Sequence, residues 1–173
     1  MATPKTIGPE EIQAAIKRLA AAITLRHRRP SSLLLLGIAN GGVELASRVA
    51  TLLGARVGTV DISFHRDDIG RHPIPKEFAP THIPIDVHGA TVILVDDVLF
   101  SGRTVKAALD ELFDHGRPAK VELAILVDRC CRRLPIVADY IGLTVAAEEK
   151  EKVVVTLDPT TTKRDSVLIC TAK

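Results

Sequence analysis

The stretch Val92-Ile93-Leu94-Val95-Asp96-Asp97-Val98-Leu99-Phe100-Ser101-Gly102-Arg103-Thr104 joins a buried strand to a helix through a polar turn. Its first four residues are aliphatic and three of them are β-branched, which is typical of a strand buried on both faces, as in a parallel sheet. Two carboxylates follow where we expect this strand to end. Apolar residues at helical spacing then predict a helix, which Gly116 should end: Val105, Ala108, Leu109 and Leu112.

The turn after the acid pair has the composition of an anion-binding site. Backbone N–H groups at a helix start lack intrahelical partners, and the helix dipole is positive there. A Ser-Gly turn lets a phosphate approach these groups, and the hydroxyls of Ser101 and Thr104 can donate to it. Asp96 and Asp97 would repel a phosphate alone, so we expect them to accept hydrogen bonds from sugar hydroxyls or to bind Mg²⁺ through water. The stretch therefore predicts a site for a ribose 5-phosphate that carries a metal-bound group. An ordinary strand, turn and helix with a capping aspartate is the alternative.

Residues 92–104 resemble the phosphoribosyl-pyrophosphate (PRPP) motif of type I phosphoribosyltransferases. Beyond this motif, the chain is most similar to the PyrR family of bifunctional pyrimidine-operon regulators and uracil phosphoribosyltransferases. Four further segments carry that resemblance, which covers nearly the whole chain: 61–68, 126–129, 134–136 and 138–142. The resemblance implies an α/β protein with the type I phosphoribosyltransferase fold, in which helices flank a mostly parallel central sheet and a flexible hood loop covers the site.

Length and composition favour one domain over residues 1–173, because a chain of this length can bury a substantial core. The net charge of +2 is too small to indicate a nucleic-acid partner by itself. Apolar runs are too short for a membrane span and the N-terminus has no signal-peptide hydrophobic region, so we expect a cytoplasmic protein without a membrane partner. No metal-ligand spacing connects Cys130, Cys131 and Cys170, and we expect them to be reduced thiols.

A second strand, Gly-rich turn and helix are predicted upstream of the motif. Residues 33–38 form the expected strand, Ala39-Asn40-Gly41-Gly42 the turn, and the helix continues to about Leu53. Backbone N–H groups in such a turn can bind an anion. The resemblance makes this the pyrophosphate loop and implies a non-proline cis peptide at Ala39-Asn40. PyrR proteins usually carry Lys or Pro, then Thr and Arg, at these places, so a cation that would pair with pyrophosphate is missing here.

A long segment with repeated prolines, residues 65–84, separates the two strand–turn–helix units. Loops of this length in a compact domain are often lids. Type I enzymes close a hood over PRPP to exclude water from the reaction. On this interpretation Arg66, together with Arg71 and Lys76, reaches the diphosphate. A surface loop without that role is the alternative.

The base is expected to lie beside the strand predicted over residues 120–127. Loops at the carboxyl end of a strand lie next to the central site of an open α/β sheet, and Asp128 and Arg129 follow this strand. The resemblance implies that they and the Lys152-Val153 stretch frame the base, largely through backbone groups. Residues 153–157 and 166–169 predict a closing hairpin. Purine-salvage relatives place an acid where this chain has Phe100, which argues against hypoxanthine or guanine as substrate.

The resemblance therefore implies that uracil and PRPP react to give UMP and diphosphate, with Mg²⁺ as cofactor. Asp96, Asp97 and Arg66 would be the catalytic residues, and the two aspartates would also approach Mg²⁺ through water. The 5-phosphate and its sugar would contact the rest of the motif: Val98, Leu99, Phe100, Ser101, Gly102, Arg103 and Thr104. Two alternatives remain, a regulator that senses UMP or PRPP and binds RNA with little catalysis, and a purine phosphoribosyltransferase. A homodimer or homotetramer is the assembly that the resemblance implies.

RNA-binding PyrR proteins carry basic residues on a face formed by the first helix, predicted here from Pro9 to about Arg26, and by the later block. Some basic residues remain in this chain: Lys17, Arg18, Arg26 and Arg132. Others are replaced, by Ala21, Cys130-Cys131, Val137 and Leu143. RNA affinity depends on the number of phosphate contacts, so the sequence predicts weakened binding to a leader mRNA.

Overall fold

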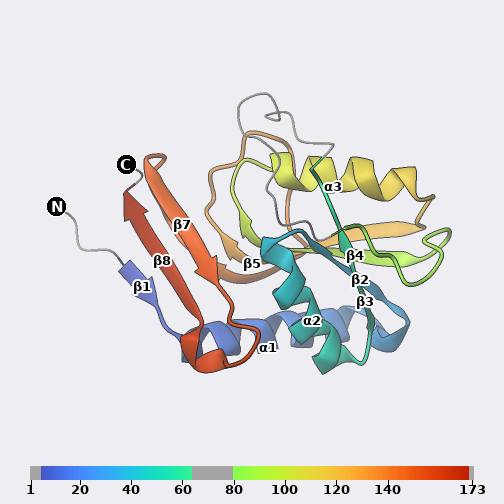
Figure 1. Cartoon of the computed structure of the whole chain (residues 1–173), viewed down its shortest axis with the longest axis horizontal. Helices are drawn as coiled ribbons and strands as arrows, with labels where there is room; N and C mark the ends of the chain where they lie inside the picture. The colour runs from blue at the N-terminus through green and yellow to red at the C-terminus, as the bar shows by residue number, and fades with distance from the viewer. Residues whose placement is uncertain (1–4, 64–79, 172–173) are drawn as a thin grey trace.

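The structure, a computed structural model, describes residues 5–63 and 80–171 and contains two sheets within them (Figure 1). The main sheet is parallel, with strand order β3-β2-β4-β5-β6, and a smaller antiparallel sheet has the order β1-β8-β7. The small sheet lies to one side of the main sheet, close to both chain ends. The strands are β1 (Lys5–Ile7), β2 (Leu34–Ile38), β3 (Arg56–Val60), β4 (Thr91–Leu99), β5 (Lys120–Asp128), β6 (Tyr140–Thr144), β7 (Glu151–Thr156) and β8 (Ser166–Thr171).

Both faces of the main sheet are covered, as the aliphatic strands predicted. Side chains along β2 alternate between the faces: Leu35 packs with Ile93 in the core beneath the first two helices, whereas Leu34 and Leu36 pack with the third. The helices are α1 (Pro9–Arg26), α2 (Gly41–Leu53) and α3 (Arg103–Asp114), with short 3₁₀ turns η1 (Pro30–Ser32) and η2 (Thr162–Arg164). All three helices lie where the sequence predicted them.

The predicted end of the central strand was wrong. β4 continues through the acid pair to Leu99, because its pairing with β5 extends as far as Leu99 opposite Asp128. Pairing with β2, on the other edge, stops at Gly37 opposite Val95. Asp96 and Asp97 thus lie in a strand that is paired on one side and faces the turn after β2 on the other.

The small sheet includes the predicted hairpin, since β7 and β8 pair in antiparallel fashion from Glu151 opposite Thr171 to Thr156 opposite Ser166. The sequence analysis did not predict β1, which pairs with β8, or β6, which extends the main sheet. Both strands are short, and β1 gains its order from tertiary pairing. β7 also contacts β4, which brings the small sheet against the central strand.

Most of the predicted lid, residues 64–79, lies outside the described residues, and so do Arg66, Arg71 and Lys76. Its last residues are described: His82 exchanges backbone hydrogen bonds of 2.9 and 2.8 Å with Thr59 of β3. This bridge returns the chain to the main sheet before β4. Across residues 5–63 and 80–171, no helix is long and apolar enough to cross a membrane.

The C-terminal end of α1 is bound to the main sheet through one buried carboxylate. Glu122 of β5 is 2% exposed and accepts a hydrogen bond of 2.7 Å from the Tyr140 hydroxyl. His27 Nε2 lies 2.7 Å from the same carboxylate and Arg26 Nε lies 3.3 Å from it. Burial alone would raise the pKa of Glu122, but hydrogen bonds from Lys120, Tyr140 and His27 outweigh it and lower that pKa to about 2.

We expect Glu122→Gln to lower stability at neutral pH and to reduce its dependence on acid pH. A folded-state pKa below the ordinary value stabilises the native protein above about pH 4.5, and this contribution, on the order of 3 kcal/mol, disappears as the pH falls toward about 2. Urea unfolding at about pH 7, 5 and 3 measures it. Tyr140→Phe is the control, because it removes one hydrogen bond but leaves the titrating carboxylate. A difference between Glu122→Gln and wild type that stays constant across this range would contradict the assignment.

Candidate active site

The acid pair, Asp96 and Asp97, lies in β4 just beyond the last residue of that strand that pairs with β2. Asp96 is 5% exposed, and its Oδ1 accepts a 3.0 Å hydrogen bond from the backbone N–H of Asp97. Burial raises the pKa of Asp96 well above its usual range, and the adjacent Asp97 carboxylate raises it further. Burial also raises the pKa of Asp97. A ligand that brings hydroxyl donors or a cation would favour the charged form of both groups.

The predicted pyrophosphate loop packs directly on this pair. A Cβ added at Gly41 would lie 2.6 Å from Oδ2 of Asp97, and one at Gly42 would lie 2.0 Å from the carbonyl oxygen of Val95. Gly42 has no room for a side chain because its Cβ would meet the backbone of β4, and a Cβ at Gly41 would displace the Asp97 carboxylate. The start of α2 therefore packs directly on β4. The peptide between Ala39 and Asn40 is cis, as the resemblance implied. Residues 39–42 and the acid pair therefore form one site.

The phosphate turn of residues 100–104 leads into α3 through a left-handed glycine. Gly102, at φ +90°, is the N-cap residue of α3, and the Ser101 hydroxyl oxygen accepts a 3.3 Å hydrogen bond from the first helical N–H, that of Arg103. The N–H groups of Arg133 and Leu134 donate to the carbonyl oxygen of Ser101 at 3.1 and 3.0 Å, which fixes the turn from outside. The first turn of α3 thus presents backbone N–H groups, with the positive end of the helix dipole, at the end of β4.

Sequence reasoning missed the contribution of residues 133–136 to this turn. Besides the two hydrogen bonds to Ser101, the side chains of Leu134 and Ile136 lie over Gly102, 3.2–3.4 Å from where its Cβ would be. Gly102 in the turn and the apolar Leu134-Pro135-Ile136 sequence were the available signals, but only the fold places them together.

Beside the turn, an arginine stacks on the predicted base-selecting residue. The guanidinium of Arg129 lies 4.1 Å from the ring centroid of Phe100. Arg129 is 5% exposed, and its Nη2 donates to the carbonyl oxygens of Glu148 and Glu151 at 3.1 and 2.7 Å. Arg129 therefore joins the phosphate turn to the segment that leads into β7, where it acts through its contacts with Phe100 and the backbone.

The other predicted base-framing residues differ in how they can act. The Asp128 carboxylate accepts a 2.8 Å hydrogen bond from the N–H of Cys130 and pairs with Arg132, so it is engaged within the chain. Val153 is buried in the core, which leaves its backbone for contact with a base. Lys152 precedes it in β7, the outer strand of the small sheet. These positions agree with framing through backbone groups.

Comparison with known protein families identifies the family to which this chain belongs. The model of the phosphoribosyl transferase domain matches residues 8–159. Curated proteins named "Bifunctional protein PyrR" from Chloroflexus aurantiacus and Streptomyces coelicolor are 45% and 46% identical to the chain. The alignments cover 89% of this chain and 88% of the first relative, and 97% of this chain and 89% of the second. The chain belongs to the phosphoribosyl transferase family, and within it to the PyrR proteins.

Solved structures agree at the level of the fold. A hypoxanthine-guanine phosphoribosyltransferase from Bacillus anthracis superposes with a TM-score of 0.68 at 19% identity, over 99% of this chain and all of that one. The hypoxanthine phosphoribosyltransferase of Trypanosoma cruzi gives a TM-score of 0.68 at 21% identity, over 95% of both chains. The predicted type I phosphoribosyltransferase fold is confirmed. Because both identities are below 25%, these two structures support the fold of this chain but not the choice of its base.

We expect Gly42→Ala to destabilise the protein, because its methyl group cannot be accommodated against the Val95 carbonyl without moving α2 or β4. A loss of about 2–4 kcal/mol in the free energy of unfolding would be in line with overpacking against backbone. Gly8→Ala is the matched control, since nothing lies within 4 Å of its added Cβ. Urea unfolding of both variants tests this, and equal stabilities would contradict the close approach.

Proposed function

We propose that this chain is a uracil phosphoribosyltransferase that converts uracil and PRPP to UMP and diphosphate. One observation carries the proposal: Asp97 lies against Gly41, so the acid pair and the pyrophosphate loop meet at one point. The phosphate turn continues from the same strand. A sugar at the acid pair could therefore place its 5-phosphate on one turn and its diphosphate on the other.

In the proposed mechanism Asp96 and Asp97 accept hydrogen bonds from the ribose hydroxyls. Residues 98–104 bind the 5-phosphate through the first-turn N–H groups of α3, with the Ser101 and Thr104 hydroxyls as further donors. The Ala39 N–H donates to the Val60 carbonyl oxygen at 3.0 Å, so the backbone N–H groups of residues 40–42 would meet the diphosphate, and Arg66 would act on it from the lid. The protein acts mainly by aligning the reactants and stabilising charge that develops at the sugar and the diphosphate.

Mg²⁺ fits this site as a group that arrives with PRPP. The two buried carboxylates with raised pKa values favour a nearby cation. However, in residues 5–63 and 80–171 no three His, Cys, Asp or Glu side chains gather closely enough to bind a metal ion. Asp96 and Asp97 would approach Mg²⁺ through water while PRPP oxygens supply the other ligands, and the ion would neutralise the leaving diphosphate.

Phe100 supports a pyrimidine as the base. Its ring is covered by the Arg129 guanidinium, and it carries no acid that could interact with a purine imidazole. The base would lie between this stack and the edge of β7, where Lys152 and Val153 contribute backbone groups. We further propose that the protein works in the cytoplasm as a homodimer or homotetramer, as its resemblance to PyrR implies.

We expect diphosphate release from PRPP and Mg²⁺ with uracil and none with hypoxanthine or guanine.

Asp97→Asn should lower kcat/KM by roughly a hundredfold, because the amide cannot accept both hydroxyl hydrogen bonds as a carboxylate does. Asp110→Asn, on the exposed side of α3, is the control and should retain activity. Absence of turnover with every base, while UMP still raises the melting temperature, would instead favour a nucleotide-sensing regulator whose missing loop cation has cost it catalysis.

The second activity of the family, RNA binding, is weakened in this proposal because three of the four remaining cations are engaged within the chain: Arg18, Arg26 and Arg132. Arg26 Nη1 donates to Asp139 at 3.0 Å and its Nε lies 3.3 Å from Glu122. Arg18 Nη2 donates to the carbonyl oxygen of Gly142 at 3.0 Å. Val137, at a position where RNA-binding PyrR proteins carry a basic residue, is 74% exposed. Few cations on this face are available to replace the counterions of an RNA backbone.

We expect no nanomolar complex with the cognate leader RNA in filter-binding assays, with or without UMP. Val137→Arg should strengthen binding and steepen its dependence on salt by about one unit of slope, since it adds one phosphate contact. Leu52→Arg places the same charge on another exposed apolar position and serves as control. Nanomolar, UMP-enhanced binding by the wild-type chain would overturn this part of the proposal.

A further inference from the structure

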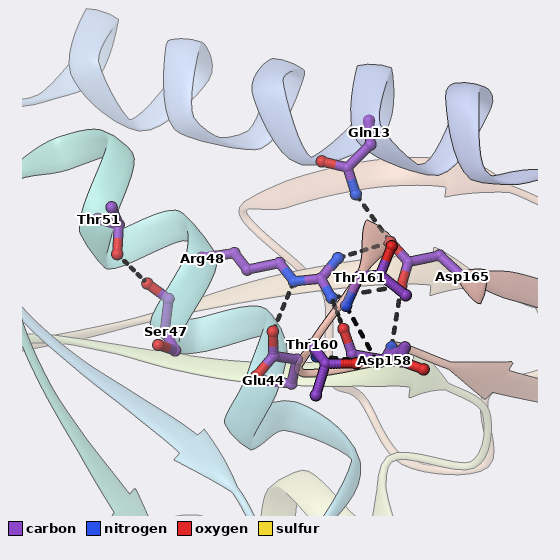
Figure 2. A network of polar contacts seen from close by, with 9 residues as sticks. All are labelled: Gln13, Glu44, Ser47, Arg48, Thr51, Asp158, Thr160, Thr161 and Asp165. Carbon is purple, nitrogen blue, oxygen red and sulfur yellow. Dashed lines mark hydrogen bonds and ion pairs between the residues drawn. The ribbon is translucent and has the colours of Figure 1, made fainter. Parts of the chain in front are cut away.

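A network of polar side chains connects α2 to the small sheet, and we call it the Arg48 network: Gln13, Glu44, Arg48, Asp158 and Asp165 (Figure 2). Arg48 of α2 points toward the connection between β7 and β8. Its Nη1 donates to Oδ2 of Asp165 at 2.6 Å, and its Nη2 donates to Oδ1 at 3.3 Å and to the carbonyl oxygen of Asp158 at 2.7 Å. One arginine thus contacts both ends of this connection.

Both members of the central ion pair are largely removed from water. The side chain of Asp165 is 0% exposed and that of Arg48 is 15% exposed. Asp165 also accepts hydrogen bonds from Gln13 Nε2 of α1 at 2.8 Å and from the backbone N–H of Asp158 at 2.9 Å. Glu44 accepts from Arg48 Nε at 2.7 Å, which fixes the guanidinium on its own helix. A bidentate pair with this many partners has one preferred geometry.

The connection that Arg48 contacts is itself ordered. Oδ1 of Asp158 accepts hydrogen bonds from the backbone N–H groups of Thr160 and Thr161 at 2.8 and 3.1 Å, and from the Thr160 hydroxyl at 2.6 Å. Hydrogen bonds from Thr160 lower the pKa of this carboxyl to about 2. A fixed position for Asp165 and Asp158 therefore fixes the whole β7–β8 hairpin.

The two ends of the proposed substrate site depend on different contacts. The start of α2 is fixed on β4 by the backbone approach at Gly42 and by the contact of Gly41 with the Asp97 carboxylate, neither of which involves Arg48. The small sheet, whose strand β7 contacts β4, carries the proposed base-framing residues Lys152 and Val153. Its links to the remainder of the chain include the Arg48 network and the bonds of Arg129 to Glu148 and Glu151.

We propose that Arg48 and Asp165 are positioning residues that set the place of the small sheet, and hence of the base, relative to PRPP bound at α2 and β4. This inference rests on the proposed uracil phosphoribosyltransferase function. Loss of the pair leaves the diphosphate and 5-phosphate contacts intact and lets β7 shift away from the base. Its effect therefore falls on uracil and UMP rather than on PRPP.

The test measures KM for uracil, KM for PRPP and kcat in wild type, Arg48→Met, Asp165→Asn and Arg48→Lys, together with calorimetric Kd values for UMP and for PRPP. We expect Arg48→Met and Asp165→Asn to raise KM for uracil and Kd for UMP about tenfold, with PRPP constants within about twofold of wild type. Arg48→Lys retains the charge and should recover part of the loss, because an ammonium can still contact one carboxylate oxygen. Asp165→Asn has nearly the shape of the native residue and remains informative if Arg48→Met fails to fold.

Tyr140→Phe is the stability control, since it loses a buried hydrogen bond near the start of β5 and β6, away from the acid pair. It should lower the melting temperature and leave all five constants unchanged. Equal effects of the Arg48 and Asp165 variants on uracil and PRPP, or a loss of melting temperature alone, would overturn the positioning role. If wild type binds UMP without turnover, the catalytic proposal fails and the Kd values alone decide the inference. If wild type binds neither UMP nor PRPP, both fail.

Discussion

The site depends on one packing constraint, the backbone contact between the start of α2 and β4. A helix can approach the backbone of a strand this closely only where a side chain is absent, as at Gly42, and the neighbouring Gly41 leaves room for the Asp97 carboxylate. The contact has room because β2 stops pairing with β4 at Val95 while β5 continues to Leu99. Because the β2–β4 pairing ends earlier than the β4–β5 pairing, the acid pair has a strand neighbour on one side only. Its other side faces the turn that would bind diphosphate.

The same constraint explains the electrostatics. Placing Asp97 against a glycine and burying Asp96 beside it removes water from both carboxylates, which raises their pKa values. Three other buried carboxylates have cationic partners: Glu122 lies near Arg26, Asp128 near Arg132 and Asp165 near Arg48. The acid pair differs from these structural pairs because its favourable partner is supplied by a ligand. Stored electrostatic cost of this kind is typical of functional sites.

Local pattern predicted the parts of the fold that depend on local physics. The aliphatic run 92–95, the Gly-rich turn 39–42 and the periodic residues of α3 each have a short-range cause, and each was placed correctly. The strand end at the acid pair was misplaced because polar residues usually stop a strand, whereas pairing with β5 carried this one to Leu99. The stack of Arg129 on Phe100 and the pairing of β1 with β8 join residues far apart in sequence, so no local sequence pattern could predict them.

The two ends of the site also differ in how they are built. Backbone packing, glycines and a helix start form the sugar-phosphate end, which the fold itself defines. Purine phosphoribosyltransferases with TM-scores of 0.68 share that fold at 19–21% identity. In the proposed site, the base end would depend on side chains that position the backbone of the small sheet, namely the Arg129 stack and the Arg48 network. Specificity in this chain should therefore be sought in the small sheet and its attachments rather than in the motif that reveals the family.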